Sequence, residues 1–302
     1  MRPDIALIGP GKVGCAISRR LYRSGYPITA VIGRDIERAT DACQFIGCTT
    51  NVATTDLTRA SQARVILLAV PDDHISAVSA TLNSKANSLT GKTLVHFSGL
   101  HKASCMQKEG ETQAFSTISI HPLLPFADRT LASQRLSGCP CALEGDEISM
   151  ALGTELITAF EGQPFLIKSD KKDLYHAAAC KSSNYLVTLL SGAETLLAEC
   201  GISKAEGLSL LSPLLRATLD NVIKLGTEQG LTGPIVRGDM ATVAKHIDAM
   251  AQISNEQLNS YLVLADQTVS LARKSTRLDE HTAQKLHFFL QDKRIKFKTN
   301  NI

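Results

Sequence analysis

Three glycines near the N-terminus have the spacing of a loop that binds phosphate. The run Gly9-Pro10-Gly11-Lys12-Val13-Gly14 fits the pattern G-x-G-x-x-G and follows an apolar segment, Ile5–Ile8. In such a loop the first glycine permits a tight turn, the second lets a pyrophosphate approach the backbone, and the third lets a helix pack closely on a strand. The free N–H groups at the start of the helix then bind the anion. The order strand, loop, helix, second strand favours a dinucleotide over a glycine-rich turn without a ligand.

The end of the second predicted strand, Ile28–Ile32, bears on which dinucleotide binds. It is followed by Gly33, Arg34 and Asp35, at the place where an acidic residue accepts a hydrogen bond from the ribose 2′-hydroxyl of NAD. A small residue followed by an arginine instead leaves room for the 2′-phosphate of NADP and offers it a charged partner, so Arg34 favours NADP, with NAD as the alternative. Asp35 either caps the next helix, Ile36–Phe45, or is a ribose ligand shifted by two positions.

Further candidates follow other predicted strands and therefore share the edge of the sheet where ligands bind. Val70 and Pro71 are expected to face the cofactor, while Asp72 or Asp73 could cap the helix that follows. Ser98 and Gly99 are small enough to admit a substrate or a nicotinamide ring closely. His121, at the end of the strand Phe115–Ile120, is either structural or able to transfer a proton near neutral pH.

A polar run interrupts an apolar helical segment, roughly Leu174–Glu199. Lys181-Ser182-Ser183-Asn184 must be satisfied by neighbours, water or a ligand, because unpaired polar groups destabilise an apolar environment. In one interpretation Lys181 extends to the surface and Asn184 bonds a loop. In the other, Lys181 donates a proton to a carbonyl oxygen and Asn184 orients that carbonyl. His176 on the same segment is a further catalytic candidate.

A loop between later helices offers a binding group for an anionic substrate. In Leu231–Asp239 the Gly-Pro pair is rigid and Gly238 is flexible. Arg237 can hold a substrate carboxylate through two parallel hydrogen bonds. Asp239 is expected to cap the helix Met240–Ala251 and could also orient Arg237.

The elements that position these residues are of two kinds. Up to about Leu166 short apolar runs alternate with helical patterns, which is typical of an α/β fold, a Rossmann-like doubly wound parallel sheet with helices on it. Strands are expected at Ile5–Ile8, Ile28–Ile32, Val65–Val70, Leu94–Phe97, Phe115–Ile120, Cys141–Glu144 and Pro164–Ile167. Only helices follow, at about 174–199, 204–225, 240–251, 255–274 and 282–293. The sequence thus predicts a dinucleotide-binding domain at 1–168 and a smaller all-α domain for substrate binding and dimerisation at 169–302.

Composition excludes several classes of partner. A net charge of +3 and the absence of tryptophan argue against a nucleic acid. The eight cysteines include no C-x-x-C pair, so no metal site is expected and the thiols are expected to be reduced and mostly buried. The N-terminus lacks the pattern of a signal peptide, and no apolar run is long enough to span a bilayer. A cytoplasmic protein without a membrane partner is therefore expected.

Taken together, the motifs resemble a family of bacterial Rossmann-like oxidoreductases whose C-terminal helical domain is of unknown function. The resemblance covers nearly the whole chain. Its most specific parts are the glycine loop, His96 with Ser98-Gly99, His121-Pro122, the stretch from Tyr175 to Asn184, and Thr232-Gly233-Pro234 with Arg237-Gly238-Asp239. The helical domain is similar to that of 6-phosphogluconate dehydrogenase, which implies homodimerisation through helices and an active site between the domains.

Smaller similarities point to particular reactions. Lys181-x-x-Asn184 is similar to the lysine and asparagine of β-hydroxyacid dehydrogenases, although Tyr185 stands where a second asparagine is usual. His121-Pro122 is similar to a motif of prephenate dehydrogenases, and the two-domain plan is similar to pyrroline-5-carboxylate and ketopantoate reductases. The function expected is an NADP-dependent oxidoreductase for a small carbonyl compound with a carboxylate, a 2-keto acid such as ketopantoate or a β-hydroxyacid/keto acid pair. The alternatives are an enzyme like the prephenate or pyrroline-5-carboxylate enzymes, and a catalytically silent NAD(P)-binding redox sensor.

Overall fold

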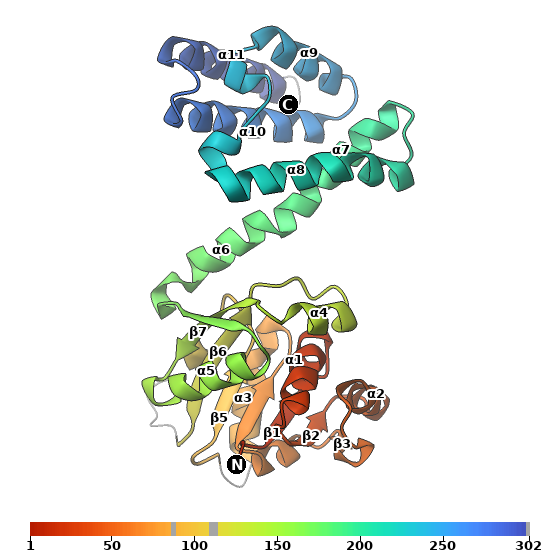
Figure 1. Ribbon diagram of the computed structural model, residues 1–302, viewed down its shortest axis with the longest axis vertical. Coiled ribbons are helices and arrows are strands. Elements are labelled where there is room, and N and C mark those ends of the chain that lie inside the picture. The colour runs from red at the N-terminus through yellow and green to blue at the C-terminus, as the bar shows by residue number, and fades with distance from the viewer. Residues whose placement is uncertain (86–88, 109–113, 300–302) are drawn as a thin grey trace. The chain divides into compact units, whose positions relative to one another are not determined.

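The computed structural model describes residues 1–85, 89–108 and 114–299 (Figure 1). By internal contacts the chain divides into two compact units, Met1–Tyr185 and Leu186–Ile302, which are described separately. The boundary expected after residue 168 falls between the last strand and the first long helix beyond it, and it stays a prediction of where the functional domains divide.

The first unit is built on an eight-stranded sheet. Its strands are β1 (Ile5–Ile8), β2 (Ile28–Ile32), β3 (Ala53–Thr54), β4 (Val65–Leu68), β5 (Thr93–His96), β6 (Ser116–Pro122), β7 (Pro140–Gly145) and β8 (Gln163–Leu166). They lie in the order β3-β2-β1-β4-β5-β6-β7-β8. The first six have the order of a doubly wound dinucleotide-binding sheet, so the predicted fold class is confirmed. The chain order changes direction between β1 and β4, where ligands of such sheets bind.

Two features of the sheet differ from the prediction. β7 runs antiparallel to β6, whereas all strands were expected to be parallel. The register pairs Pro122 with Cys141, so β7 begins beside the point where β6 ends and must run back along it. β8 then pairs with β7 in parallel. The second difference is β3, which was not predicted because two residues are too few to show an alternating pattern.

Helices cover both faces of the sheet. β1 places Ile5 and Leu7 in one buried cluster and Ala6 and Ile8 in another, as expected when successive side chains point to opposite faces. The first cluster includes residues of α1 (Lys12–Arg23), α2 (Ile36–Ile46), α4 (Arg129–Arg135) and α5 (Met150–Ala159). The second includes residues of α3 (Ile75–Lys85).

The long helix expected over 174–199 is two helices, α6 (Lys172–Ser182) and α7 (Asn184–Glu199). Ser183 separates them with φ −117° and ψ −69°, outside the range of an α-helix. The apolar side chains of this segment are not all buried in the single chain, since those of Val187 and Leu189 on α7 are 68% and 45% exposed.

The second unit is helical, as predicted. α8 (Lys204–Gly230), α9 (Met240–Ala251), α10 (Asn255–Lys274) and α11 (Glu280–Thr299) follow α7, and residues of the last three form most of its buried core. The bounds predicted for α9 and α10 are confirmed, whereas α8 is longer than expected. α8 is bent at Gly226, where φ is +79°.

The sequence predicts reduced, mostly buried cysteines and no apolar segment long enough to span a bilayer. All eight cysteines are free thiols; Cys200, in the turn after α7, is exposed, whereas the other seven are buried or partly buried. Within the described residues no single helix is long and apolar enough to cross a bilayer, although one bent pair, Ser169–Glu199 with Lys204–Arg237, has the required length and composition.

Candidate active site

The glycine loop between β1 and α1 is shaped as its motif predicts. Gly9 has φ +87°, and a Cβ atom there would lie 2.6 Å from the carbonyl oxygen of Ala69. A Cβ on Gly14 would lie 2.7 Å from the carbonyl oxygen of Gly9, so the third glycine allows α1 to pack closely on the loop. Gly11, in contrast, would place a Cβ in open space, with no atom within 4 Å. The first and third glycines are therefore needed for packing, and the second leaves a free approach to the backbone.

The start of α1 leaves its N–H groups available. Gly11 is the N-cap residue and no side chain caps this helix. The first helical hydrogen bond is donated by the N–H of Cys15 to the carbonyl oxygen of Gly11, so the amides of Lys12, Val13 and Gly14 precede the first internal bond. Open space beside Gly11, uncapped amides and the positive end of the helix dipole fit a diphosphate. Pro10 closes the loop on the side of Gly33, whose added Cβ would lie 3.2 Å from the proline ring.

The two residues that follow Gly33 after β2 have different roles: one caps a helix and the other is free to contact the cofactor. Asp35 caps α2 by accepting a hydrogen bond of 2.8 Å from the N–H of Glu37, so the capping interpretation of this carboxylate is confirmed. Arg34 is exposed next to it. Because Asp35 is bound to its own helix, Arg34 is the group at this position that can meet a 2′-phosphate.

Ser98 after β5 is tied to the turn after β4. Its hydroxyl donates to a carboxylate oxygen of Asp72 at 2.6 Å and accepts hydrogen bonds from the N–H groups of Leu100 and His101. The carboxylate of Asp72 accepts from Ser98, and no side chain caps the short 3-10 helix Asp72–His74 that leads into α3, so the capping role expected of Asp72 or Asp73 is not found there. Val70 and Pro71 lead into this turn, at the same edge of the sheet as the glycine loop.

His96, the last residue of β5, is fully buried and fixes the same turn. Its Nδ1 accepts from the N–H of Ser98 at 3.1 Å, and its Nε2 lies 3.2 Å from the carbonyl oxygen of Lys102. These partners require a neutral ring with the proton on Nε2. Burial, followed by the charge of Lys172, lowers the pKa of His96 to about 3.

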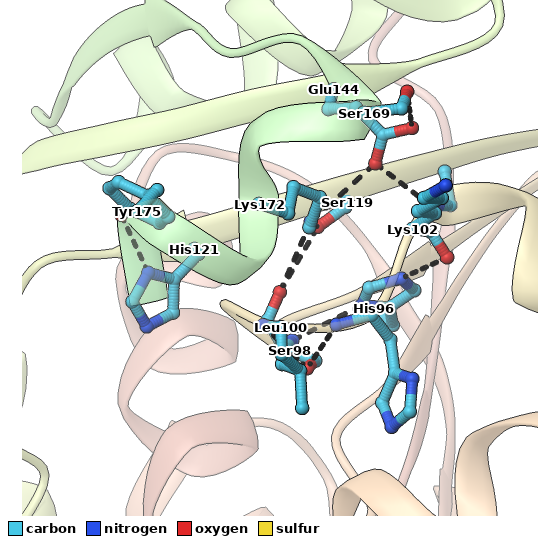
Figure 2. Close-up of polar contacts among 12 residues, drawn as sticks. His96, Ser98, Leu100, Lys102, Ser119, His121, Glu144, Ser169, Lys172 and Tyr175 are labelled. Atoms are coloured by element: carbon cyan, nitrogen blue, oxygen red, sulfur yellow. Dashed lines mark hydrogen bonds and ion pairs between the residues drawn. The ribbon is translucent and has the colours of Figure 1, made fainter. Parts of the chain in front are cut away.

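His121, the second-last residue of strand β6, is paired with Tyr175 of α6. Nδ1 of His121 lies 2.7 Å from the Tyr175 hydroxyl (Figure 2). Burial, followed by the charges of His176 and Lys172, lowers the pKa of His121 to about 4, whereas burial raises the pKa of Tyr175. At pH 7 the imidazole is therefore neutral and the phenol keeps its proton. A phenol that donates to Nδ1 leaves Nε2 as the protonated nitrogen.

Gly99 lies between His121 and His176. A Cβ on Gly99 would lie 2.9 Å from Nε2 of His121 and 2.7 Å from Cδ2 of His176. The two imidazole centroids are 6.1 Å apart. The structure thus brings two predicted catalytic residues and a predicted small residue into one cluster, and Tyr175 joins them.

Lys181 and Asn184 are not part of this cluster. Lys181 is exposed and lies nine residues after Lys172 along α6, a rise of about 13 Å. Asn184 is the first residue of α7, beyond the interruption at Ser183, so the Lys-x-x-Asn spacing does not lie on one continuous helix.

The predicted carboxylate-binding residue belongs to the second unit. Arg237 is exposed at the end of a short 3-10 helix, Ile235–Arg237. Asp239 caps α9 as predicted, accepting from the N–H of Thr242 at 3.0 Å and from its hydroxyl at 2.6 Å. The charge of Arg237 also contributes to lowering the pKa of Asp239.

Three residues at the cluster were not predicted to act there: Lys172, Glu144 and Tyr175. Lys172 stands in a charged segment, residues 168–173, yet its side chain is only 2% exposed. Its Nζ lies 2.5 Å from the hydroxyl of Ser119 and 3.5 Å from a carboxylate oxygen of Glu144. The available signal was spacing: Lys172 precedes Tyr175 by three residues and His176 by four, which places all three on one helix face.

Comparisons with known proteins agree with this architecture. Residues 4–98 match the family model described as NADP oxidoreductase, coenzyme F420-dependent, and residues 139–268 match a domain of unknown function, DUF2520. The predicted resemblance to Rossmann-like NAD(P)-dependent oxidoreductases with a C-terminal domain of unknown function is therefore confirmed, and the first match supports NADP. No match is found among curated proteins.

Solved structures with the same fold span nearly the whole chain. Protein TM1727 from Thermotoga maritima is 25% identical over 90% of this chain and 99% of its own, with a TM-score of 0.68. The candidate NADP oxidoreductase BF3122 from Bacteroides fragilis is 20% identical over 88% and 98%, with a TM-score of 0.71. A pyrroline-5-carboxylate reductase from Coxiella burnetii is 16% identical over 95% and 99%, with a TM-score of 0.57.

Proposed function

We propose that this chain, an NAD(P)-dependent oxidoreductase, is an NADPH-dependent reductase that acts on the C=O or C=N bond of a small compound carrying a carboxylate. The observation that carries the proposal is the position of His121. Its ring is neutral, its Nδ1 is held by Tyr175, and its Nε2 faces Gly99 at the edge of the sheet that also holds the glycine loop. Pyrroline-5-carboxylate reductase, which shares the fold, supports a C=N bond beside the C=O bond expected from the sequence.

The side chains of the cluster have distinct roles in this reaction. NADPH, when bound at the glycine loop, supplies a hydride. His121 donates a hydrogen bond from Nε2 to the substrate oxygen or nitrogen and so stabilises the negative charge that develops there, as a neutral imidazole can do. A proton from water then completes the alcohol or amine product. Tyr175 keeps the proton on Nε2 by donating to Nδ1. Gly99 lets the rings of His121 and His176 lie close against its backbone, since a Cβ atom there would be within 3 Å of both.

Two exposed arginines are proposed to bind the anionic groups of the cofactor and the substrate. Arg34 binds the 2′-phosphate that distinguishes NADP from NAD. Arg237 holds the substrate carboxylate, and a 2-keto acid such as ketopantoate is the first candidate. Lys181 is the alternative group that could donate a proton to the substrate, with Asn184 as the residue that would orient the carbonyl. Eight free thiols support a reducing compartment such as the cytoplasm.

The proposal is tested by following NADPH oxidation against a panel of 2-keto acids, β-keto acids and cyclic imines. His121→Ala should lower turnover at least 100-fold while NADPH binding, measured by fluorescence titration, stays intact. Lys181→Ala is the matched comparison and should retain most of the activity. The opposite pattern would assign the proton to Lys181, and NADPH binding without turnover of any compound would favour the redox sensor.

Cofactor choice has its own test. Arg34→Ala should weaken NADPH binding by about tenfold or more and leave NADH binding nearly unchanged, because only NADPH carries the additional phosphate. Equal losses for both nucleotides would remove the preference for NADP.

We also propose that the protein is a homodimer formed through α7 and α8. Large apolar side chains on these helices are exposed in the single chain, among them Val187, Leu210, Leu214, Leu219 and Ile223, which are 50–80% exposed. Exposed apolar surface of this extent is typical of a face that another protein covers. A second copy of the chain is the partner implied by the family resemblance.

A further inference from the structure

A buried ammonium group lies directly behind the His121 cluster. Nζ of Lys172 lies 2.5 Å from the hydroxyl of Ser119, 3.4 Å from the carbonyl oxygen of Ser98, and 3.5 Å from a carboxylate oxygen of Glu144 (Figure 2). Ser119 in turn donates to the same carbonyl of Ser98 at 3.2 Å. The three donors of the ammonium thus have three acceptors, and Lys172 forms part of one continuous network with both strand ends.

The carboxylate of this pair is also held from several sides. One oxygen of Glu144 accepts from the N–H of Ala103 at 2.8 Å, and the other accepts from the hydroxyl of Ser169 at 2.7 Å. Glu144 is 6% exposed. An ion pair removed from water persists only when its remaining hydrogen-bonding positions are filled, and here they are.

The partners of Lys172 are the immediate neighbours of the reactive cluster. Ser119 precedes His121 by two residues on β6, and Ser98 adjoins Gly99. On α6, Tyr175 and His176 follow Lys172 by one helical turn on the same face. Lys172 is therefore the link between the helix that carries Tyr175 and His176 and the two strand ends that carry Gly99 and His121.

We propose that Lys172 is a positioning residue of the reductase site: it fixes the first turn of α6 against β5 and β6 and thereby holds Tyr175 on Nδ1 of His121. The inference rests on the proposed function, and it adds a residue to that site. The ion pair with Glu144 anchors Lys172, and the contacts with Ser98 and Ser119 transmit its position to the cluster.

The electrostatic surroundings of His121 agree with this role. The charged or titratable groups that act on it are Lys172 and His176 from α6, and Asp72 from the turn after β4; Tyr175 contacts it without a charge. Burial, followed by the charges of His176 and Lys172, lowers the pKa of His121, and Asp72 raises it.

The test is the ionisation and tautomer of His121 in the full-length protein, measured by NMR on chains labelled with ¹⁵N-histidine. The variant Lys172→Met with Glu144→Gln removes both charges together, so that no unpaired charge is left buried. The matched control is Lys171→Met, which changes an exposed lysine next to it. The His121 signals are identified by their loss in His121→Gln.

In the wild type and in Lys171→Met we expect one tautomer, protonated at Nε2, with a titration midpoint well below the ordinary histidine value. In the double variant we expect a mixture of tautomers and an approximately tenfold higher proton affinity of His121, because both the fixed Tyr175 and a nearby positive charge are lost. Lys172→Met alone should show the same change where it folds.

A merely structural role for Lys172 would lower the melting temperature of the double variant and leave His121 as a single tautomer, as in the wild type, because loss of the lysine charge by itself changes only the titration midpoint. That result in a folded double variant would overturn the inference. The measurement needs no substrate. Failure of the proposed function would instead appear as unchanged NADPH oxidation in His121→Ala, so the two outcomes are distinguishable.

Discussion

The neutral imidazole of His121 links the stability of the protein to pH. Its pKa in the folded chain is about 4, and that of His96 is about 3, both below the ordinary value of 6.5. Between pH 6.5 and those values the unfolded chain binds protons that the folded chain does not, so the free energy of unfolding falls as pH falls. From pH 7 to pH 5 we expect each histidine to contribute a loss of about 2 kcal/mol.

Urea unfolding at pH 7 and pH 5 measures this loss. The variant His121→Gln, which carries no titrating ring, should show a smaller difference between the two pH values than the wild type. The comparison uses the difference within each protein, so a general destabilisation by the substitution does not enter. Equal differences in both proteins would contradict a depressed pKa at His121.

Gly99 is expected to be the most sensitive small residue at the site. Gly99→Ala would place a methyl group within 3 Å of the rings of both His121 and His176, and both would have to move. Because the glycine loop is untouched, NADPH affinity should stay within about twofold while turnover falls at least tenfold, as displacement of reacting groups by fractions of an ångström predicts. Ser104→Ala, in the nearby 3-10 helix Ala103–Met106, serves as an exposed control.

The pair Lys172 and Glu144 should be costly to break. Glu144→Ala leaves a buried ammonium without its carboxylate, and we expect a loss of about 3–5 kcal/mol in the free energy of unfolding. Lys171→Met should change this free energy by less than about 0.5 kcal/mol. A loss below about 1 kcal/mol for Glu144→Ala would show that the pair does not behave as a buried ion pair.

Individual side chains could be predicted from the sequence only in part. Local spacing predicts the glycine loop, the Asp35 cap and the position of His121 near a strand end. The structure confirms where these residues lie. Local spacing places Lys172 on one helix face with Tyr175 and His176, but it does not show that the lysine is buried, because that burial depends on a carboxylate twenty-eight residues earlier in the chain. The emphasis on Lys181 came from a spacing that assumes one continuous helix.

At the scale of elements, α1 and its loop offer a test that separates packing from binding. Gly14→Ala would bring a methyl group within 3 Å of the backbone of Gly9 and of two neighbouring side chains, so the free energy of unfolding should fall by about 1–3 kcal/mol. Gly11→Ala meets no atom within 4 Å and has negative φ, so stability should be retained. The same Gly11 methyl group lies on the approach to the uncapped amides and should weaken NADPH binding at least tenfold.

Chemical denaturation measures the stability of the two variants, and fluorescence titration measures their affinity for NADPH. Loss of stability in Gly11→Ala, or unchanged NADPH affinity, would contradict the assignment of this loop. Retained stability in Gly14→Ala would contradict the close contact between α1 and Gly9.

The reversed strand β7 explains why α6 reaches the site. β8 is parallel to β7 and therefore runs opposite to β6. The chain leaves β8 beside Leu143, which is opposite Ile120, so that Lys172 arrives behind Ser119 and the next helical turn meets His121. The sequence pattern predicts the strand at 141–144 but does not reveal its direction, because apolar runs look alike in parallel and antiparallel strands.

At the scale of the whole molecule, the proposed homodimer can be tested by measuring the mass of the protein in solution. Light scattering coupled to size exclusion should give the mass of a dimer for the wild type and that of a monomer for Leu214→Lys, which places a charge in the exposed apolar face of α8. Leu131→Lys, on α4 of the first unit and similarly exposed, should remain dimeric. A monomeric wild type would contradict the homodimer, and a dimeric Leu214→Lys would place the interface elsewhere.

The division into an α/β unit and a helical unit could be predicted from the sequence, since the periodicity of apolar residues changes after Leu166. The lengths of the helices and the points where they break or bend could be predicted less well. The break at Ser183 and the bend at Gly226 depend on the backbone angles of single residues, which apolar periodicity does not report.

The lone exposed thiol at the turn after α7 makes this chain ready for site-directed spectroscopy. Cys200 should react first with a maleimide or a nitroxide reagent, since the remaining thiols are shielded to differing degrees. A nitroxide at this position would report, by pulsed electron resonance, the separation between two subunits in an assembled pair, without any engineered cysteine.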